Sequence, residues 1–138
     1  MTTVSAASRD VPAGLRPVRF ALGFDAVGSG LNGLAFLALS GTLSDTLGLS
    51  QPLLLGLGAF FTLYALGLAV LATRPRIPLE LVRLVAAGNL TWVLASVVVA
   101  ATGVVDPDTT AGEVWLIAQA LLVLDFGLLQ LWAVRRAG

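Results

Sequence analysis

The sequence predicts an all-α protein, a transmembrane four-helix bundle with both termini in the cytoplasm. Three observations predict it: an excess of apolar residues, four long apolar segments, and arginines confined to alternate connections. Of the 138 residues, 57% are hydrophobic and 12% are charged, and the mean hydropathy is +0.94. A soluble domain is nearer half apolar and a quarter charged, and so small a globule has too little interior for this excess. The composition therefore predicts a membrane protein and excludes an ordinary soluble enzyme.

The composition also excludes several kinds of chemistry. The chain has no Cys and no His, and all eight of its basic residues are arginines. Disulfides, thiolate nucleophiles, imidazole bases, the usual zinc sites and lysine Schiff bases are therefore excluded. The formal net charge is zero, which is not the pattern of a nucleic-acid-binding protein. We expect no metal, no cofactor and no nucleic-acid partner.

Four apolar segments are long enough to cross about 30 Å of hydrocarbon, which takes about 20 helical residues. They run over residues 20–40, 52–73, 80–103 and 114–134. They are continuous and rich in Leu and Ala, whereas β-barrel strands would alternate over about ten residues. We therefore divide the chain into a flexible cytoplasmic tail, residues 1–15, and a transmembrane domain, residues 16–138.

Each later segment begins after a recognisable signal. The second begins at Pro52, because the first turn of a helix tolerates proline. The third follows residues 74–78, where two prolines interrupt the apolar pattern. The fourth follows a turn-rich polar stretch, residues 105–112, and the connection over residues 42–51 is expected to be a loop.

The arginines predict the orientation. They are Arg9, Arg16, Arg19, Arg74, Arg76, Arg83, Arg135 and Arg136. All of them lie before the first segment, around the connection between the second and third, or after the fourth. The two remaining connections, residues 42–51 and 104–113, contain acidic residues and no arginine. Because cytoplasmic connections carry the excess of Arg and Lys, we expect an inner-membrane protein with both termini inside.

The sequences of the two halves of the chain can be aligned with each other at a shift of 64 residues. This shift aligns Val18-Arg19 with Val82-Arg83, and it aligns Asp25 with Asn89. One interpretation is a parallel repeat of two αα-hairpins about an axis along the membrane normal. The other is coincidence between two apolar hairpins of similar composition.

Polar residues inside the segments are the candidate site. An Asp at the centre of a spanning helix costs about 2.5–3.5 kcal/mol on insertion scales, so it usually faces the interior and has a partner. A rise of 1.5 Å per residue predicts two tiers. The inner tier contains Asp25, Asn89, Gln130 and Asp125, and the outer tier contains Asn32, Ser96 and Gln119. The proposed ligand or proton site comprises Asp25, Asn32, Asn89, Trp92, Asp125 and Gln130.

More than one interpretation fits these polar residues. Asp125 lies roughly 120–140° around its helix from the Gln119–Gln130 face, so it faces a second seam, a neighbouring subunit or the edge of a wide cavity. Trp92 lies near the midplane, where its N–H needs a partner that a carboxylate could supply. Asp25 is either protonated or ionised with a bound cation, and two carboxylates could also share one proton. The alternative to a site is that these polar side chains form hydrogen bonds between helices.

A family resemblance rests on several short motifs. They are Asp25-Ala26 in a Gly-rich first segment with Asn32, Gly88-Asn89 followed by Trp92 and Ser96, Gly112, Gln119-Ala120 and Leu129-Gln130. In these the chain resembles a group of short, uncharacterised four-helix integral membrane proteins of high-GC bacteria, DoxX-like in size and layout. The resemblance covers roughly residues 16–134. It implies an inner-membrane four-helix bundle and brings no catalytic residues with it.

Three functions are compatible with this pattern. The first is a bundle that binds or transports a small molecule, an ion or protons at the Asp/Asn/Gln site. The second is an accessory or structural subunit of a membrane complex. The third is a membrane-embedded enzyme that uses Asp25 and Asp125 to modify a lipid, quinone or isoprenoid. The expected surroundings are the lipid bilayer, with a homo-oligomer or a larger membrane complex as the assembly.

Overall fold

The computed structural model describes residues 14–137, and it is all-α within that range. The helices are α2 (Arg16–Ala38), α3 (Ser40–Leu47), α4 (Gln51–Thr73), α5 (Leu79–Thr102) and α6 (Thr110–Ala137). Helices α2, α4, α5 and α6 are each long and apolar enough to cross a membrane. They overlap the four predicted segments, so the predicted all-α bundle with four long apolar helices is confirmed. Most of the predicted tail, residues 1–13, lies outside the described residues.

The connection after the first segment differs from the prediction, because it contains a short helix, α3, instead of a loop. Leu39 interrupts the helical backbone with φ −121° and ψ 25°, and α3 then ends at Gly48, which adopts the left-handed φ of 64°. Ser, Gly and Thr are weak helix formers, which is why the sequence did not indicate a helix here. Tertiary contacts supply the stabilisation: Leu47 is buried, and the Thr109 hydroxyl donates to the Thr46 carbonyl at 2.7 Å.

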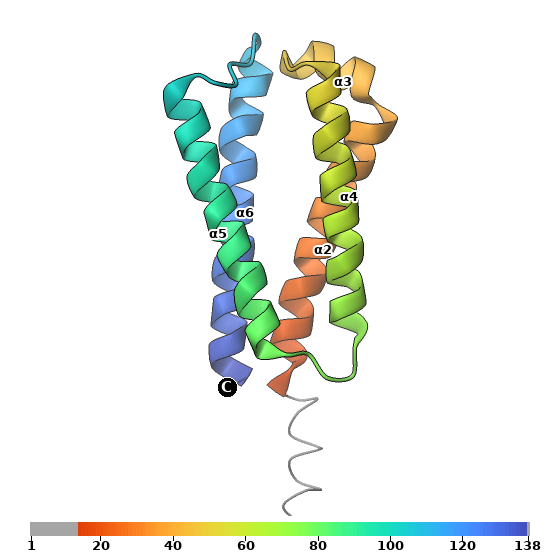
Figure 1. The fold of residues 1–138 in the computed structure, drawn as a ribbon, viewed down its shortest axis with the longest axis vertical. Helices are drawn as coiled ribbons and strands as arrows, with labels where there is room; N and C mark the ends of the chain where they lie inside the picture. Colours follow the sequence, from red (N-terminus) through yellow and green to blue (C-terminus); the bar gives the residue numbers. More distant parts are fainter. Residues whose placement is uncertain (1–13, 138) are drawn as a thin grey trace, which may run out of the picture.

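The long helices form two pairs, α2 with α4 and α5 with α6, and α2 also packs against α6. Figure 1 shows these pairs as two columns that separate toward the end that carries α3. Helices α4 and α5 do not pack closely against each other. Within the first pair the backbones approach closely, since a Cβ atom on Gly33 would lie 2.7 Å from the Thr62 amide nitrogen. This pairing agrees with the predicted two αα-hairpins.

One end of the bundle, which we call the arginine end, holds the start of α2, the α4–α5 connection and the end of α6. The Arg19 side chain lies here and donates to the carbonyl of Ala72 and, at 2.9 Å, to that of Arg74. These carbonyls lie at the end of α4, where the helix leaves them without helical partners. A cation there also interacts favourably with the negative end of the helix dipole. Arg19 therefore ties the first two long helices together at this end.

The interior has two apolar clusters separated by a polar layer. The cluster at the arginine end includes Val18, Leu22 and Val82, which are fully buried, and Leu15 of the predicted tail also packs there. The cluster at the α3 end contains Phe36, Leu47, Leu49 and Leu54. Val18 and Val82 are the positions that the predicted repeat aligns, and they occupy the same cluster.

The outer surface is apolar along the spanning helices. Leu31, Leu63, Leu84 and Leu94 expose 64–69% of their surfaces. Such a continuous apolar exterior is unusual for a soluble monomer and suits contact with lipid. The chain is therefore a multi-pass membrane protein whose described part is a helical bundle.

Candidate functional site

The polar layer at the middle of the bundle contains one residue from each long helix. Asp25 comes from α2, Tyr64 from α4, Asn89 from α5 and Gln130 from α6, and Ser29 joins one turn after Asp25. We call these five residues the inner cluster. Asp25 and Gln130 are completely buried, and Asn89 is nearly so.

The Asp25 carboxyl group is the centre of the inner cluster. Its Oδ2 atom accepts hydrogen bonds from Gln130 Nε2 at 2.7 Å, Asn89 Nδ2 at 2.9 Å and the Tyr64 hydroxyl at 3.2 Å. Its Oδ1 atom accepts from the Ser29 hydroxyl at 2.9 Å. Asn89 Nδ2 also donates to Gln130 Oε1 at 2.8 Å. The three hydrogen bonds to Oδ2 join α4, α5 and α6 to α2.

The groups around Asp25 determine what it can bind. A metal ion needs oxygen lone pairs, but the four groups that face this carboxyl donate hydrogen atoms to it. Among residues 14–137, no group of three or more Asp, Glu, His or Cys side chains could hold a metal ion. In this arrangement the Asp25 carboxyl is satisfied by hydrogen bonds from its neighbours.

The Tyr64 hydroxyl lies between two hydrogen-bond acceptors of the inner cluster. It lies 2.8 Å from Asn89 Oδ1 and 3.2 Å from Asp25 Oδ2, and its one hydrogen can serve only one of them. The Tyr64 hydroxyl therefore connects the Asp25 carboxyl to the Asn89 side chain, and its hydrogen can point to either acceptor.

A second group, the outer cluster, lies toward the α3 end and joins α5 to α6. Trp92 Nε1 donates to Gln119 Oε1 at 2.8 Å, and Gln119 Nε2 donates to the Ser96 hydroxyl at 3.1 Å. The Trp92 N–H thus has a partner, as the sequence indicated it would need, and this partner is an amide oxygen and not a carboxylate. Trp92 lies about one turn beyond Asn89 along α5, and the polar group opposite it on α6 is the Gln119 amide.

Two residues of the predicted site lie outside both clusters. Asn32 is half-buried and takes no part in their hydrogen bonds. Asp125 is exposed on the outer face of α6, away from the inner cluster, so among the alternatives it faces a second seam of its helix. Depth along the helix is similar, but Asp125 precedes Gln130 by five residues, which rotates it about 140° away. Asp25 and Asp125 thus do not face a common substrate site within one chain.

Two members of the inner cluster were not among the predicted site residues. Tyr64 is the only tyrosine of the chain and lies inside an apolar segment, where a buried hydroxyl needs a partner. Ser29 follows Asp25 by four residues and therefore lies on the same helix face. Both signals were present in the sequence, but neither says which helices lie opposite.

A pocket of about 120 Å³, which we call the inner pocket, opens beside the inner cluster. Ser29, Tyr64 and Asn89 contribute its polar wall, and Phe60, Phe61, Trp92, Gly88 and Val123 complete the lining. The Phe60 ring stacks on Trp92 with centroids 5.8 Å apart, and this aromatic contact bridges α4 and α5. Buried polar groups and aromatic faces therefore meet in one pocket where α4 and α5 diverge.

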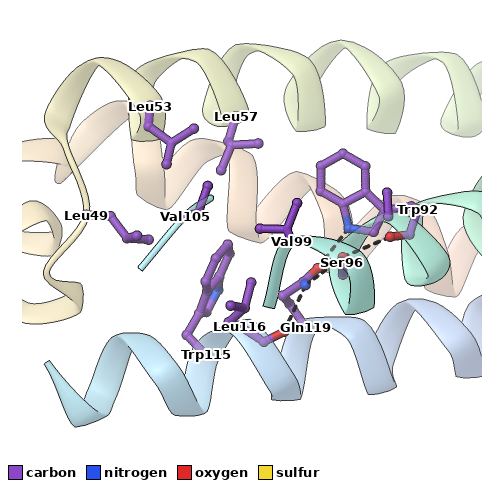
Figure 2. A pocket seen from close by; sticks show the side chains of 11 residues that line it. Leu49, Leu53, Leu57, Trp92, Ser96, Val99, Val105, Trp115, Leu116 and Gln119 are labelled. Atoms are coloured by element: carbon purple, nitrogen blue, oxygen red, sulfur yellow. Dashed lines mark hydrogen bonds between the residues drawn. The ribbon is translucent and has the colours of Figure 1, made fainter. Parts of the chain in front are cut away.

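A second pocket, the outer pocket, has a volume of about 170 Å³ and an almost entirely apolar lining. Figure 2 shows Leu53 and Leu57 of α4 facing Trp115 and Leu116 of α6 across it. Trp92 lines both pockets. The two pockets thus follow the α4–α5 crevice from the polar layer toward the α3 end.

Comparisons with known proteins add no family to these observations. No family model matches the chain, and neither a curated protein nor a solved structure does. The function proposed below therefore rests on the two clusters and the two pockets.

Proposed function

We propose that this protein binds a small lipid-soluble molecule in the crevice between α4 and α5. The observation that carries the proposal is that Tyr64 and Asn89, two members of the buried polar cluster, also line an open pocket. Binding sites typically combine an apolar and aromatic lining with a few converging polar groups. Asp25 lies behind these two residues and holds them in position through its hydrogen bonds.

The dimensions and lining of the pockets indicate the class of ligand. An apolar cavity of about 150 Å³ holds one benzene molecule, so each pocket has room for about one ring or a few methylene groups. The polar wall suits a hydroxyl group, which could donate to the Tyr64 oxygen or to Asn89 Oδ1, or a carbonyl group, which could accept the Tyr64 hydrogen in place of Asn89 or Asp25. The apolar outer pocket suits an adjoining chain. A quinone or an isoprenoid alcohol has this combination, and either could enter laterally from the bilayer.

Replacing Tyr64 by phenylalanine is the direct test of this site. The change removes the hydroxyl from the pocket wall, while the Asp25 carboxyl keeps its bonds from Asn89 and Gln130. Loss of one hydrogen bond of about 1–1.5 kcal/mol corresponds to roughly 5- to 13-fold weaker binding. A short-chain quinone is a suitable probe in lipid nanodiscs, because it quenches tryptophan fluorescence and Trp92 and Trp115 line the pockets.

The matched control is Phe20→Leu, which alters an exposed aromatic side chain of α2 outside both pockets. This variant should bind the quinone as the wild-type protein does. Native mass spectrometry of the protein from its own membrane should also detect a small molecule that Tyr64→Phe loses. Equal quenching in the wild-type protein, Tyr64→Phe and Phe20→Leu, together with no molecule retained in native mass spectrometry, would contradict the proposal.

We also propose the orientation and location of the bundle. The support is the distribution of arginines, because those of the described residues gather at the arginine end while the α3 end carries acidic residues. By this rule the arginine end lies in the cytoplasm of a bacterial cell and the protein is in its inner membrane. Membership of the short DoxX-like group is part of the same proposal.

Single-cysteine labelling tests this orientation without background, because the chain has no cysteine of its own. Thr42→Cys introduces a thiol at the α3 end, and Pro75→Cys introduces one in the α4–α5 connection; both positions are exposed. In intact spheroplasts, a membrane-impermeant maleimide should label position 42 and leave position 75 unlabelled until lysis. The reverse pattern would contradict the proposed orientation.

A further inference from the structure

Asp125 is an exposed carboxyl group at the depth of the hydrocarbon. It lies on α6 about 18 Å from Glu113 and about 15 Å from Arg135, at 1.5 Å per residue, so it is near the middle of the span. No ion pair or hydrogen bond to its side chain is formed within residues 14–137. An acidic side chain at this depth is costly in contact with lipid and normally faces protein or water. In a single copy of this chain, Asp125 faces neither.

The residues around Asp125 form a regular stripe, which we call the α6 seam. Its exposed members are Val114, Ala118, Leu121, Asp125, Leu128, Trp132 and Arg135. Their spacing alternates between four and three residues, which is the heptad pattern of helices that pack side by side. The residues that face the interior, such as Gln119 and Gln130, lie on another face of the same helix. Helix α6 therefore has two packing faces, of which the single chain uses one.

We propose that the α6 seam is the interface between two copies of this chain, with their two Asp125 carboxyl groups paired. Copies inserted in the same orientation can pack α6 against α6 in parallel, about a two-fold axis along the membrane normal. In a parallel pair each seam residue faces its own counterpart, so Asp125 meets Asp125. Two carboxyl groups at close range can share a proton, which supplies each with a hydrogen-bond partner and removes one of the two charges.

We choose a second copy as the partner because the α6 seam can pair with itself, with each Asp125 supplying the partner for the other. The arginines among the described residues lie near helix ends, so no other face of this chain offers a cation at the depth of Asp125. A single polar position within an apolar heptad seam also sets the register of the two helices, as buried polar residues do in coiled coils. The rival partner is a different protein with an arginine or lysine in its own span.

Cysteine cross-linking in lipid vesicles distinguishes these possibilities. Leu121→Cys and Leu128→Cys place one thiol on the seam, on either side of Asp125. Leu63→Cys on α4 and Leu94→Cys on α5 are matched controls, because both leucines are highly exposed on other faces. With an oxidant, the seam variants should form disulfide-linked dimers and the controls should stay monomeric. Equal cross-linking at all four positions would reflect random collisions and would overturn the proposal.

Substitutions of Asp125 test the carboxyl pair itself. Asp125→Asn retains hydrogen bonding between the two copies, whereas Asp125→Leu removes it and leaves an apolar surface. We expect the leucine variant to raise the dimer dissociation constant in vesicles about 3- to 30-fold and the asparagine variant to change it much less. An unchanged dissociation constant for Asp125→Leu would refute the carboxyl pair. Recovery of the wild-type protein as one copy bound to a different membrane protein would refute the second copy.

Discussion

Replacing Asp25 by alanine is expected to lower the free energy of unfolding of the bundle by about 2–5 kcal/mol. The change removes the acceptor for three hydrogen bonds between helices, from Tyr64, Asn89 and Gln130. Such bonds in membrane proteins contribute about 0.6 kcal/mol on average and up to about 1.7 kcal/mol. Reversible unfolding in bicelles by titration with sodium dodecyl sulfate measures the difference.

Asp25→Asn separates the hydrogen bonds of this residue from its charge. An asparagine oxygen in the place of Oδ2 can still accept from Asn89 and Gln130, and its amide can donate to the Ser29 hydroxyl. We therefore expect a loss of less than about 1 kcal/mol for this variant. If Asp25→Asn destabilises the bundle as much as Asp25→Ala, the negative charge of Asp25 stabilises the cluster, and the number of hydrogen bonds that the side chain forms does not. A stable Asp25→Asn variant that no longer binds the quinone would assign the charge to ligand binding.

Replacing Gly112 by alanine is the second change with a large expected effect. Gly112 lies in the first turn of α6, and an added Cβ atom would overlap the backbone carbonyl of Leu47 and approach Pro107 Cβ to 2.5 Å. Because the main obstacle is backbone, α3 and the start of α6 would have to separate. Overpacking of this kind costs about 1–3 kcal/mol, and we expect a value near the upper limit.

The control for this variant is Gly56→Ala in α4, where an added Cβ atom meets no neighbour within 4 Å. Alanine is the better helix former, so this change should be neutral or slightly stabilising. The free energy of unfolding in bicelles should therefore be equal to or higher than that of the wild-type protein for Gly56→Ala. For Gly112→Ala it should be well below the wild-type value. Similar values for the two variants would contradict the close contact between α3 and α6.

The inner cluster shows how far sequence reasoning reaches for a site of this kind. Asp25, Asn89 and Gln130 could be assigned to one layer because depth in a spanning helix follows directly from residue number. The same arithmetic placed Asp125 at a similar depth but on another face of its helix, and it does not say what that face meets. It also did not select Tyr64, because the chain has many intramembrane hydroxyl groups and only packing decides which of them reaches a carboxylate.

The sequence by itself determined the fold class and the four spans. Water-to-lipid transfer of apolar residues depends on composition and segment length, which are properties of the chain alone. The predicted orientation depends on the distribution of arginines along the chain, which is also a property of the sequence alone. Helix α3, by contrast, depends on contacts of Leu47 and Thr46 with distant segments.

Only the tertiary structure decided which polar groups meet. In the apolar interior a hydrogen-bond donor must find its acceptor on whichever helix lies opposite, and that choice follows from how α2, α4, α5 and α6 pack. Packing brought Asp25 to Tyr64, Asn89 and Gln130, left a pocket between α4 and α5, and turned Asp125 outward. These outcomes depend on rotation and contact between helices, which residue order along a single helix does not contain.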